Sequence, residues 1–314
     1  MNLPQNTLIV EINYHTNSLI IFKLLKHICI FEKNKLMDVL ILGVIHWDVN
    51  PSIFQIGNYE LRYYTLFFML SFVIGYKIVE RIFKKEGEDI DKLGTLLTFI
   101  AIGGIMGARI GHCLFYDWDY FSSRPLEILL PIEIDNGIRF TGFRGLASHG
   151  GAIGLIISLL IWSKIHAKKH AFWIMDRLVV PMFIAGGFIR LGNLMNSEIV
   201  GSITDVAWGF EFIQSYPGEI RHAVQLYESI SYFLLAGFLF YLFEKTNLKE
   251  KRGFIFGVFL TSMFIVRFIL EFFKKEQNGL QESIDVGLTT GQLLSIPFVL
   301  VGLFIMFKSN AKND

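Results

Sequence analysis

Seven apolar runs of similar length follow one another along most of this chain. Each is close to the ~20 residues that a helix needs to cross the hydrocarbon core of a bilayer. Their approximate limits are Leu61–Val79, Leu93–Phe115, Leu146–Ser163, Leu178–Met195, Ala223–Phe243, Gly253–Phe273 and Gly291–Phe307. A shorter apolar run, Leu126–Ile134, contains Pro131, and we interpret it as a loop at the membrane surface. The pattern predicts an all-α, polytopic membrane protein with about seven transmembrane helices.

The polar connections between these runs predict an orientation. Basic residues gather in the first, third and fifth connections and in the tail, whereas the longer even-numbered connections carry fewer of them. Because cytoplasmic loops are enriched in lysine and arginine, we expect the N-terminus outside and the C-terminus in the cytoplasm. Small residues at every fourth position, Gly103, Gly107 and Gly111 in one run and Gly150 and Gly154 in another, predict close helix contacts.

The N-terminal region fits this pattern poorly. Its apolar stretch, Leu19–Phe31, is interrupted by Lys23, Lys26 and His27, so it resembles neither a signal-peptide core nor a span. We therefore divide the chain into an N-terminal extension, residues 1–48, and a membrane domain, residues 49–314. We hypothesise that residues 1–36 are absent from the native protein and that Met37 is its start.

Composition narrows the classes of function. The chain has 314 residues, of which 53% are hydrophobic and 18% charged, and its net charge is only +1. That balance excludes a strongly basic nucleic-acid-binding protein. The two cysteines form no CxxC pair and no His/Cys cluster at metal-binding spacing, so we expect no metal.

Arg190 stands inside an apolar run, where an arginine costs about 2.5–3.5 kcal/mol on insertion scales. Asn193 and Asn196 follow at steps of three, so the three polar side chains share one helical face. One interpretation is a polar seam that joins two helices, and the other is an anion site within the bilayer.

Other charged residues favour the anion site. Arginines expected near the outer half of the bilayer are Arg109, Arg190, Arg221 and Arg267, whereas the carboxylates available there are Glu228 and Glu271. Converging arginines repel one another unless an anion lies between them, and arginine binds phosphate in bidentate fashion. Arg267 and Glu271 are four residues apart and able to pair on one face. His149 begins a predicted helix, and a neutral imidazole beside a phosphate would suit a general base.

Several motifs in order resemble those of the prolipoprotein diacylglyceryl transferase family. They are Arg109-Ile110-Gly111, His149-Gly150-Gly151-Ala152-Ile153-Gly154, Arg190-Leu191-Gly192-Asn193-Leu194-Met195-Asn196-Ser197-Glu198, Arg221-His222 with Gln225-Leu226-Tyr227-Glu228, and Arg267-Phe268 with Glu271-Phe272-Phe273. The resemblance runs from about Asn50 to the last apolar run. Met263 stands where the family often has a tyrosine, and Ala223-Val224 replaces a Pro-Ser pair.

The resemblance implies a function and a site. Enzymes of this family, in the bacterial inner membrane, transfer the diacylglyceryl group of phosphatidylglycerol to the lipobox cysteine thiol of a prolipoprotein signal peptide and release glycerol phosphate. By resemblance, His149 is the candidate base, and Arg190 and Arg267 hold the phosphate. Asn193, Tyr64, Arg109 and Glu271 are the other residues expected to bind substrate, and no cofactor or metal is implied.

Two other classes of membrane protein fit less well. A transporter for an anionic lipid would also use intramembrane arginines, but we find no internal repeat between the halves of the chain. An intramembrane hydrolase would need a Gly-x-Ser-x-Gly, His-Glu-x-x-His or paired-aspartate motif, and none occurs in the sequence.

Overall fold

The computed structural model describes residues 43–57, 59–134, 137, 139–143, 145–274 and 287–309. These residues form two compact units. The helical unit comprises residues 50–198, 224–272 and 287–309, and the small unit comprises residues 43–49, 199–223 and 273–274. The hypothesis about residues 1–36 and Met37 lies outside the described residues.

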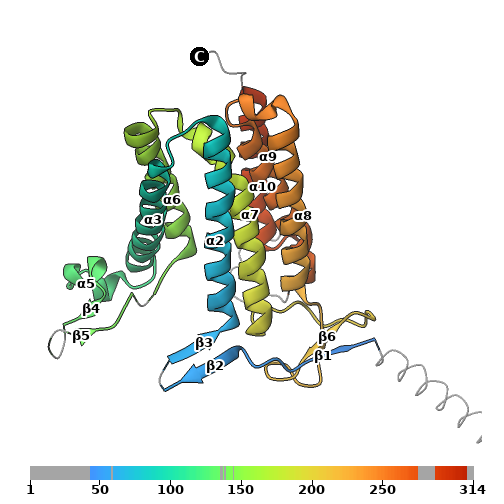
Figure 1. Ribbon diagram of the computed structural model, residues 1–314. Helices are drawn as coiled ribbons and strands as arrows, with labels where there is room; N and C mark the ends of the chain where they lie inside the picture. The colour runs from blue at the N-terminus through green and yellow to red at the C-terminus, as the bar shows by residue number, and fades with distance from the viewer. Residues whose placement is uncertain are drawn as a thin grey trace, which may run out of the picture. The chain divides into compact units, whose positions relative to one another are not determined.

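Seven long helices build the described part of the helical unit (Figure 1). They are α2 (Tyr63–Glu86), α3 (Asp91–Phe115), α6 (Ser148–Trp162), α7 (Ala171–Met195), α8 (Val224–Lys245), α9 (Phe254–Leu270) and α10 (Thr290–Lys308). Among the described residues, six helices are long and apolar enough to cross a membrane, and α2 is not one of them. The second half of α2 carries Lys77, Glu80 and Arg81. The prediction of an all-α, multi-pass membrane protein is confirmed.

Two segments depart from the predicted limits. Helix α7 begins at Ala171 rather than Leu178, and its added turns contain the buried Asp176 and Arg177. The hydropathy pattern missed these turns because charged residues interrupt it. The predicted surface loop Leu126–Ile134 contains a short helix, α5 (Pro125–Leu129), and a short strand, β4 (Ile132–Glu133).

Glycines let α3 and α6 approach closely, as their spacing predicted. A Cβ on Gly107 would lie 2.5 Å from the carbonyl oxygen of Gly150 and 2.7 Å from the Cα of Gly154. A Cβ on Gly111 would lie 2.7 Å from the Cα of Gly150. Inside a bilayer there is little hydrophobic driving force between helices, so such backbone contact supplies the packing energy.

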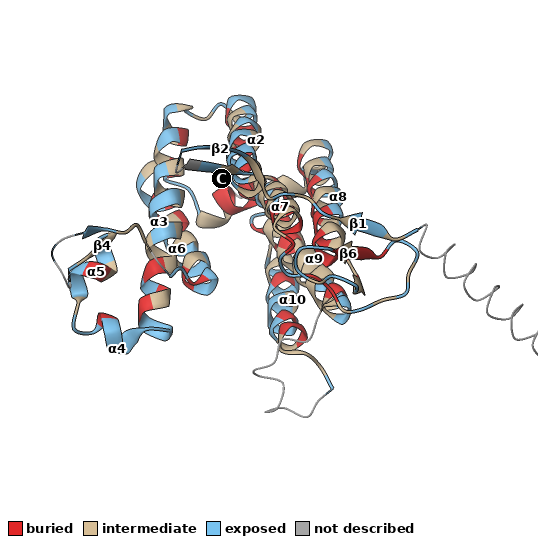
Figure 2. Ribbon diagram, turned by 90° about the horizontal axis from the view of Figure 1, so that it is seen from below, coloured by how far each residue is buried: buried red, intermediate tan, exposed pale blue. Residues whose placement is uncertain are grey.

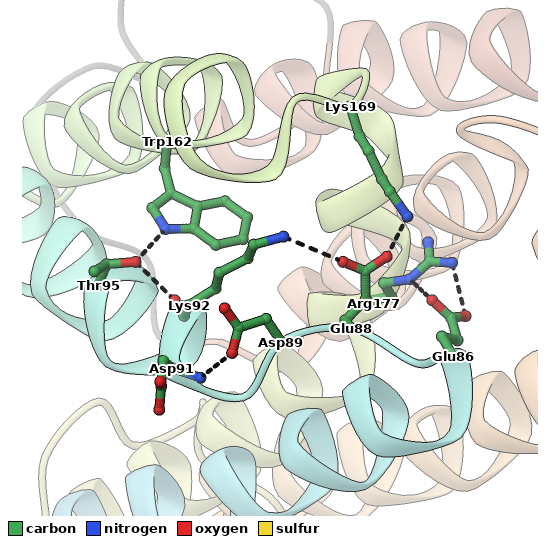
Figure 3. A network of polar contacts seen from close by, with 9 residues as sticks. All are labelled: Glu86, Glu88, Asp89, Asp91, Lys92, Thr95, Trp162, Lys169 and Arg177. Atoms are coloured by element: carbon green, nitrogen blue, oxygen red, sulfur yellow. Dashed lines mark hydrogen bonds and ion pairs between the residues drawn. The ribbon is translucent and has the colours of Figure 1, made fainter.

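Helices α2 and α7 run antiparallel and are tied together at both ends. At one end, Arg177 of α7 donates two hydrogen bonds to the Glu86 carboxylate, at 2.6 and 2.7 Å (Figure 3). At the other end, Gly192 of α7 packs against the ring of Tyr64. In the Figure 3 network, Glu88 pairs with Lys169 and with Lys92.

Helix α7 is the most buried of the predicted spans (Figure 2). In its most apolar stretch 44% of the residues are buried, against 17–33% in the other five. One apolar cluster joins it to α2, α3 and α6 through residues such as Phe83, Leu96 and Trp162. Another joins it to α8 and α9 through residues such as Leu239 and Ile255.

Short elements complete the helical unit. Strands β2 (Ser52–Ile56) and β3 (Tyr59–Arg62) form an antiparallel hairpin before α2, and β4 pairs with β5 (Arg139–Phe140). The one-turn helix α4 (Trp118–Phe121) precedes α5. A π-helical turn, Ser163–Ala167, continues α6, and 3₁₀ turns occur at Asn247–Glu250 and Glu271–Phe273.

The small unit contains a three-stranded sheet in the order β1-β6-β7. Strand β1 (Ile45–Trp47) is parallel to β6 (Phe210–Phe212), which is antiparallel to β7 (Ile220–Arg221). Phe212 is fully buried, and the rings of Trp47 and Phe210 lie 5.6 Å apart.

Candidate active site

Arg190 lies near the C-terminal end of α7, with polar partners on both sides. Its Nε atom is 2.7 Å from Oε2 of Glu228 on α8, and its Nη1 atom donates to Oδ1 of Asn193 at 3.3 Å. The spacing of three residues does place Arg190 and Asn193 within reach on one helical face. Glu228 is 1% exposed, so this ion pair has little solvent screening on the carboxylate side.

Glu198 extends this network beyond the end of α7. Its carboxylate accepts hydrogen bonds from Asn193 at 3.1 Å and from Asn196 at 3.0 Å. Its backbone carbonyl accepts from the fully buried Gln225 in the first turn of α8, at 2.6 Å. Glu198 was not among the carboxylates predicted near the arginines, although its position two residues after Asn196 was a usable signal.

Tyr232 connects this network to α9. It lies one turn after Glu228 on α8, is 5% exposed, and interacts electrostatically with Glu228, Arg190 and Arg267. The Nε atom of Arg267 is buried and has no hydrogen-bond partner among the described residues. Three helices therefore bring two arginines to one buried tyrosine.

Glu271 lies four residues after Arg267, just beyond the end of α9. Glu271 begins a 3₁₀ turn, whose tighter winding changes the four-residue relationship of an α-helix. Its carboxyl group lies against α10, where a Cβ on Gly291 would be 2.5 Å away. Anionic groups are favoured near a helix N-terminus, which accounts for this placement.

Tyr64 approaches the same end of α7 from α2. A Cβ on Gly192 would lie 2.6 Å from Cδ2 of Tyr64 and 3.2 Å from its Cα atom. Gly192 lies between Arg190 and Asn193 in the sequence, so its missing side chain lets α2 come close to the polar network.

Arg109 has its partners in the two short helices that follow α3 in the sequence. It is 4% exposed, donates from Nη2 to the carbonyl oxygen of Glu127 at 2.6 Å, and lies 4.4 Å from the Phe121 ring centroid. Glu127 is itself 2% exposed. These contacts attach α4 and α5 to α3.

Arg221 belongs to the small unit and is also satisfied there. It pairs with Glu219, donates to the carbonyl oxygen of Gly201 at 3.0 Å, and stacks over Tyr216 at 4.5 Å. The predicted count of carboxylates therefore omitted Glu219, which pairs with Arg221, whereas Arg109 donates to a backbone carbonyl and faces an aromatic ring. Arg190 and Arg267 remain as the two arginines between which a shared anion is predicted.

His149 is the second residue of α6, as the sequence predicted. Its side chain is exposed and has no hydrogen bond or ion pair with the other described residues. The neighbouring Gly150 is buried against Gly107 and Gly111 of α3. No hydrogen bond in the described part of the chain joins His149 to the Arg190 network. No group of three metal-ligating side chains is found in the same residues.

These features define a multi-pass membrane protein with a partly buried network of arginine, asparagine, glutamate and tyrosine at one end of its central helices. The chain matches the model of the prolipoprotein diacylglyceryl transferase family over residues 51–308. It therefore belongs to the prolipoprotein diacylglyceryl transferase family.

Curated relatives from three bacteria carry the same name, phosphatidylglycerol–prolipoprotein diacylglyceryl transferase. The chain is 41% identical to the Chloroherpeton thalassium protein, over 84% of the chain and 94% of that protein. It is 41% identical to the Tolumonas auensis protein, over 85% and 98%, and 40% identical to a Bacteroides fragilis protein, over 88% and 99%.

Proposed function

We propose that this protein transfers the diacylglyceryl group of phosphatidylglycerol to the lipobox cysteine thiol of a prolipoprotein, the first step of lipoprotein maturation. The family match over residues 51–308 and the names of relatives about 40% identical to the chain support this function. In the reaction, a carbon–sulfur thioether bond forms and the bond between that carbon and a phosphate oxygen breaks. Glycerol phosphate leaves with the electron pair, and the thiol proton passes to a base.

Arg190 and Arg267 are the residues proposed to bind the phosphate. The observation that carries this assignment is that Arg190 binds the buried Glu228 across α7 and α8 while the Nε atom of Arg267 on α9 is buried without a hydrogen-bond partner among the described residues. As glycerol phosphate leaves, negative charge grows on the phosphate, and positioned guanidinium groups stabilise that charge. Glu228 and Asn193 hold the Arg190 side chain, so little reorganisation would be needed.

His149 is proposed as the base that takes the thiol proton. A free cysteine has a pKa of about 8.5, so only a few per cent is thiolate at pH 7. The base must offset the free energy of ionising the thiol at pH 7, which is about 2 kcal/mol. Its exposed imidazole at the start of α6 is accessible to a substrate.

Four further residues complete the proposed substrate site. Asn193 would contact the lipid headgroup while bonded to Arg190, and Tyr64 would line the site from α2. Arg109 would shape the substrate site indirectly, by holding α4 and α5 against α3. Glu271 would line the site beside the first turn of α10.

We also propose which membrane the protein occupies and how it is oriented in that membrane. The basic odd-numbered connections favour a bacterial inner-membrane protein with its N-terminus outside and its C-terminus in the cytoplasm. In this orientation the Arg190 end of α7 faces the outer leaflet. Labelling of single cysteines at positions 164 and 203 by a membrane-impermeant maleimide tests it: only position 203 should react in intact cells.

The function is tested with purified protein, phosphatidylglycerol vesicles and a lipobox peptide, by mass spectrometry of the thioether product. Arg190→Ala should reduce transfer at least 100-fold, because it removes both the phosphate contact and the partner of Glu228. Arg252→Ala is the matched control, since Arg252 is exposed and outside the network. Normal transfer by Arg190→Ala would refute the site, and no transfer by any form of the protein would refute the function.

The role of His149 is tested separately with His149→Gln. If the imidazole is the base, the loss should be large at low pH, where thiolate is scarce, and small near pH 9. A loss that does not vary with pH would instead make His149 a positioning residue.

A further inference from the structure

A hollow of about 450 Å³ lies on the second half of α2, away from the candidate active site. Its lining residues are Lys77, Glu80, Arg81, Lys84 and Lys85. These five residues recur at spacings of three and four on one face of α2, so the hollow is open toward its surroundings. Tyr64, which contacts the Arg190 segment, is near the opposite end of α2, about 25 Å from Arg81 at 1.5 Å per residue. The hollow and the proposed substrate site therefore lie at opposite ends of this helix.

The hollow carries excess positive charge. Glu80 is shared between Lys77 at 2.9 Å and Lys84 at 2.7 Å, and Lys85 pairs with Glu244 of α8. Arg81 lies 5.9 Å from the ring centroid of Phe240 and has no ion pair among the described residues. Four basic groups thus meet two carboxylates, a balance that favours an anion.

An apolar strip leads to this basic end along the same face of α2. Leu66, Leu70 and Val73 are 43%, 38% and 59% exposed, and they precede Lys77 at steps of three or four residues. Acyl chains would cover such a strip while a charged headgroup filled the hollow. A soluble phosphate compound would use only the hollow and would leave the strip uncovered.

We propose that this surface binds an anionic phospholipid, with its phosphate against Arg81 and Lys84 and its acyl chains along Leu66–Val73. This lipid is not the one consumed in the proposed reaction, because it lies at the other end of α2. Lys85 pairs with Glu244 and Arg81 faces the ring of Phe240, so the lipid would lie beside the point where α2 contacts α8. The inference does not depend on the proposed transferase activity.

Native mass spectrometry with lipid titration tests the proposal. All variants in this experiment also carry Arg190→Ala, so that lipid bound at the proposed substrate site contributes less to the measured binding. Arg81→Gln should weaken binding of dioleoyl-phosphatidylglycerol about fivefold, as expected for one basic residue at a lipid surface. Arg252→Gln, which removes one exposed arginine elsewhere, should leave the affinity unchanged. Because Arg81 has no ion pair in the described structure, its replacement should not unfold the protein.

Three results would overturn the proposal. Equal affinity of Arg81→Gln and Arg252→Gln would mean that the hollow does not bind the lipid. Equal binding of dioleoyl-phosphatidylcholine would mean that its charge does not select the lipid. Full displacement of the lipid by equimolar glycerol 3-phosphate would mean that the apolar strip contributes nothing. An assay of diacylglyceryl transfer by the otherwise native protein judges the proposed function independently.

Discussion

The Nε atom of Arg190 lies 2.7 Å from Oε2 of Glu228, and this contact joins α7 to α8. The Glu228 side chain is 1% exposed and that of Arg190 is 23% exposed. Forming such a pair offsets the desolvation of both ions, so its net contribution to stability is small. Removing one partner is costly, because it leaves the other charge without compensation inside the protein.

Glu228→Gln should therefore destabilise the folded protein by about 2 kcal/mol, less than for a fully buried pair because Arg190 is partly exposed. Thermal unfolding in detergent, followed by tryptophan fluorescence, measures this loss. The double variant with Arg190→Gln should recover about half of it, since no unpaired charge remains. Strictly additive effects of the two substitutions would contradict a coupled pair.

A second prediction concerns the contact between Gly192 and Tyr64. Gly192→Ala would place a Cβ 2.6 Å from the Tyr64 ring and 3.2 Å from its Cα atom, so α2 must move away from α7. Overpacking of this kind costs about 1–3 kcal/mol. We expect a lower unfolding temperature together with loss of transfer, since the shift disturbs the segment between Arg190 and Asn193.

Gly237→Ala is the matched control for this substitution. Gly237 lies within α8, and a Cβ there would meet nothing within 4 Å. Alanine is favoured over glycine in a helix by up to about 1 kcal/mol, so this variant should be as stable as the parent or more stable. Equal behaviour of the two variants would show that the Tyr64 contact has no energetic role.

Much of the helical architecture could be predicted from the sequence because hydropathy and glycine spacing are local signals. Six of the seven apolar runs correspond to helices that meet the length and hydropathy expected of a membrane span. The first turns of α7 were missed because Asp176 and Arg177 are stabilised by groups distant in the sequence. The small unit was also missed, since it joins short strands from separate segments.

The candidate site was predictable in part, because some of its contacts also follow from local sequence patterns. The bond between Arg190 and Asn193 follows from helical periodicity within one segment. The partners of Arg221 lie in the loops outside β7, and those of Arg109 lie in the α4–α5 segment, where no periodic pattern identifies them. Arg267 and Glu271 lie on either side of the point where α9 ends at Leu270 and a 3₁₀ turn begins, so helical periodicity alone does not decide whether they pair.

His222 gives a third prediction, which concerns pH. It packs edge-on against Phe273 at 5.1 Å, and burial lowers its pKa below the usual 6.5, with Asp205 opposing the shift. A lowered pKa in the folded state means that folding favours the neutral imidazole. This contribution to stability is complete above pH 6.5 and is lost as the pH falls through the lowered pKa.

Histidine NMR titration in detergent measures the pKa of His222 directly. Asp205→Asn should lower this pKa further, because it removes the charge that favours the protonated imidazole. His222→Gln should flatten the dependence of the unfolding temperature on pH below 6.5. A His222 pKa at or above 6.5 would contradict the assigned effect of burial.

The last prediction concerns Asp176, whose carboxylate caps α9 from a neighbouring helix. Oδ2 accepts from the backbone N–H of Gly253 and Oδ1 from that of Phe256, both at 2.8 Å. Asp176 is 1% exposed. Asp176→Ala leaves these two N–H groups without acceptors in a buried position, so we expect a loss of about 3 kcal/mol. Because α9 carries Arg267 near its other end, transfer should fall with the folded fraction.

Two further variants distinguish loss of the Asp176 cap from a general destabilising effect of substitution. Asp176→Asn keeps the shape and one acceptor oxygen, so it should retain more stability than Asp176→Ala. Thr289→Ala removes a cap within α10 itself, where Thr289 and Gln292 form a capping box, and should cost about 1 kcal/mol. Chemical unfolding in detergent gives all three values. If Asp176→Ala costs no more than Thr289→Ala, the carboxylate of Asp176 adds nothing beyond an ordinary helix cap.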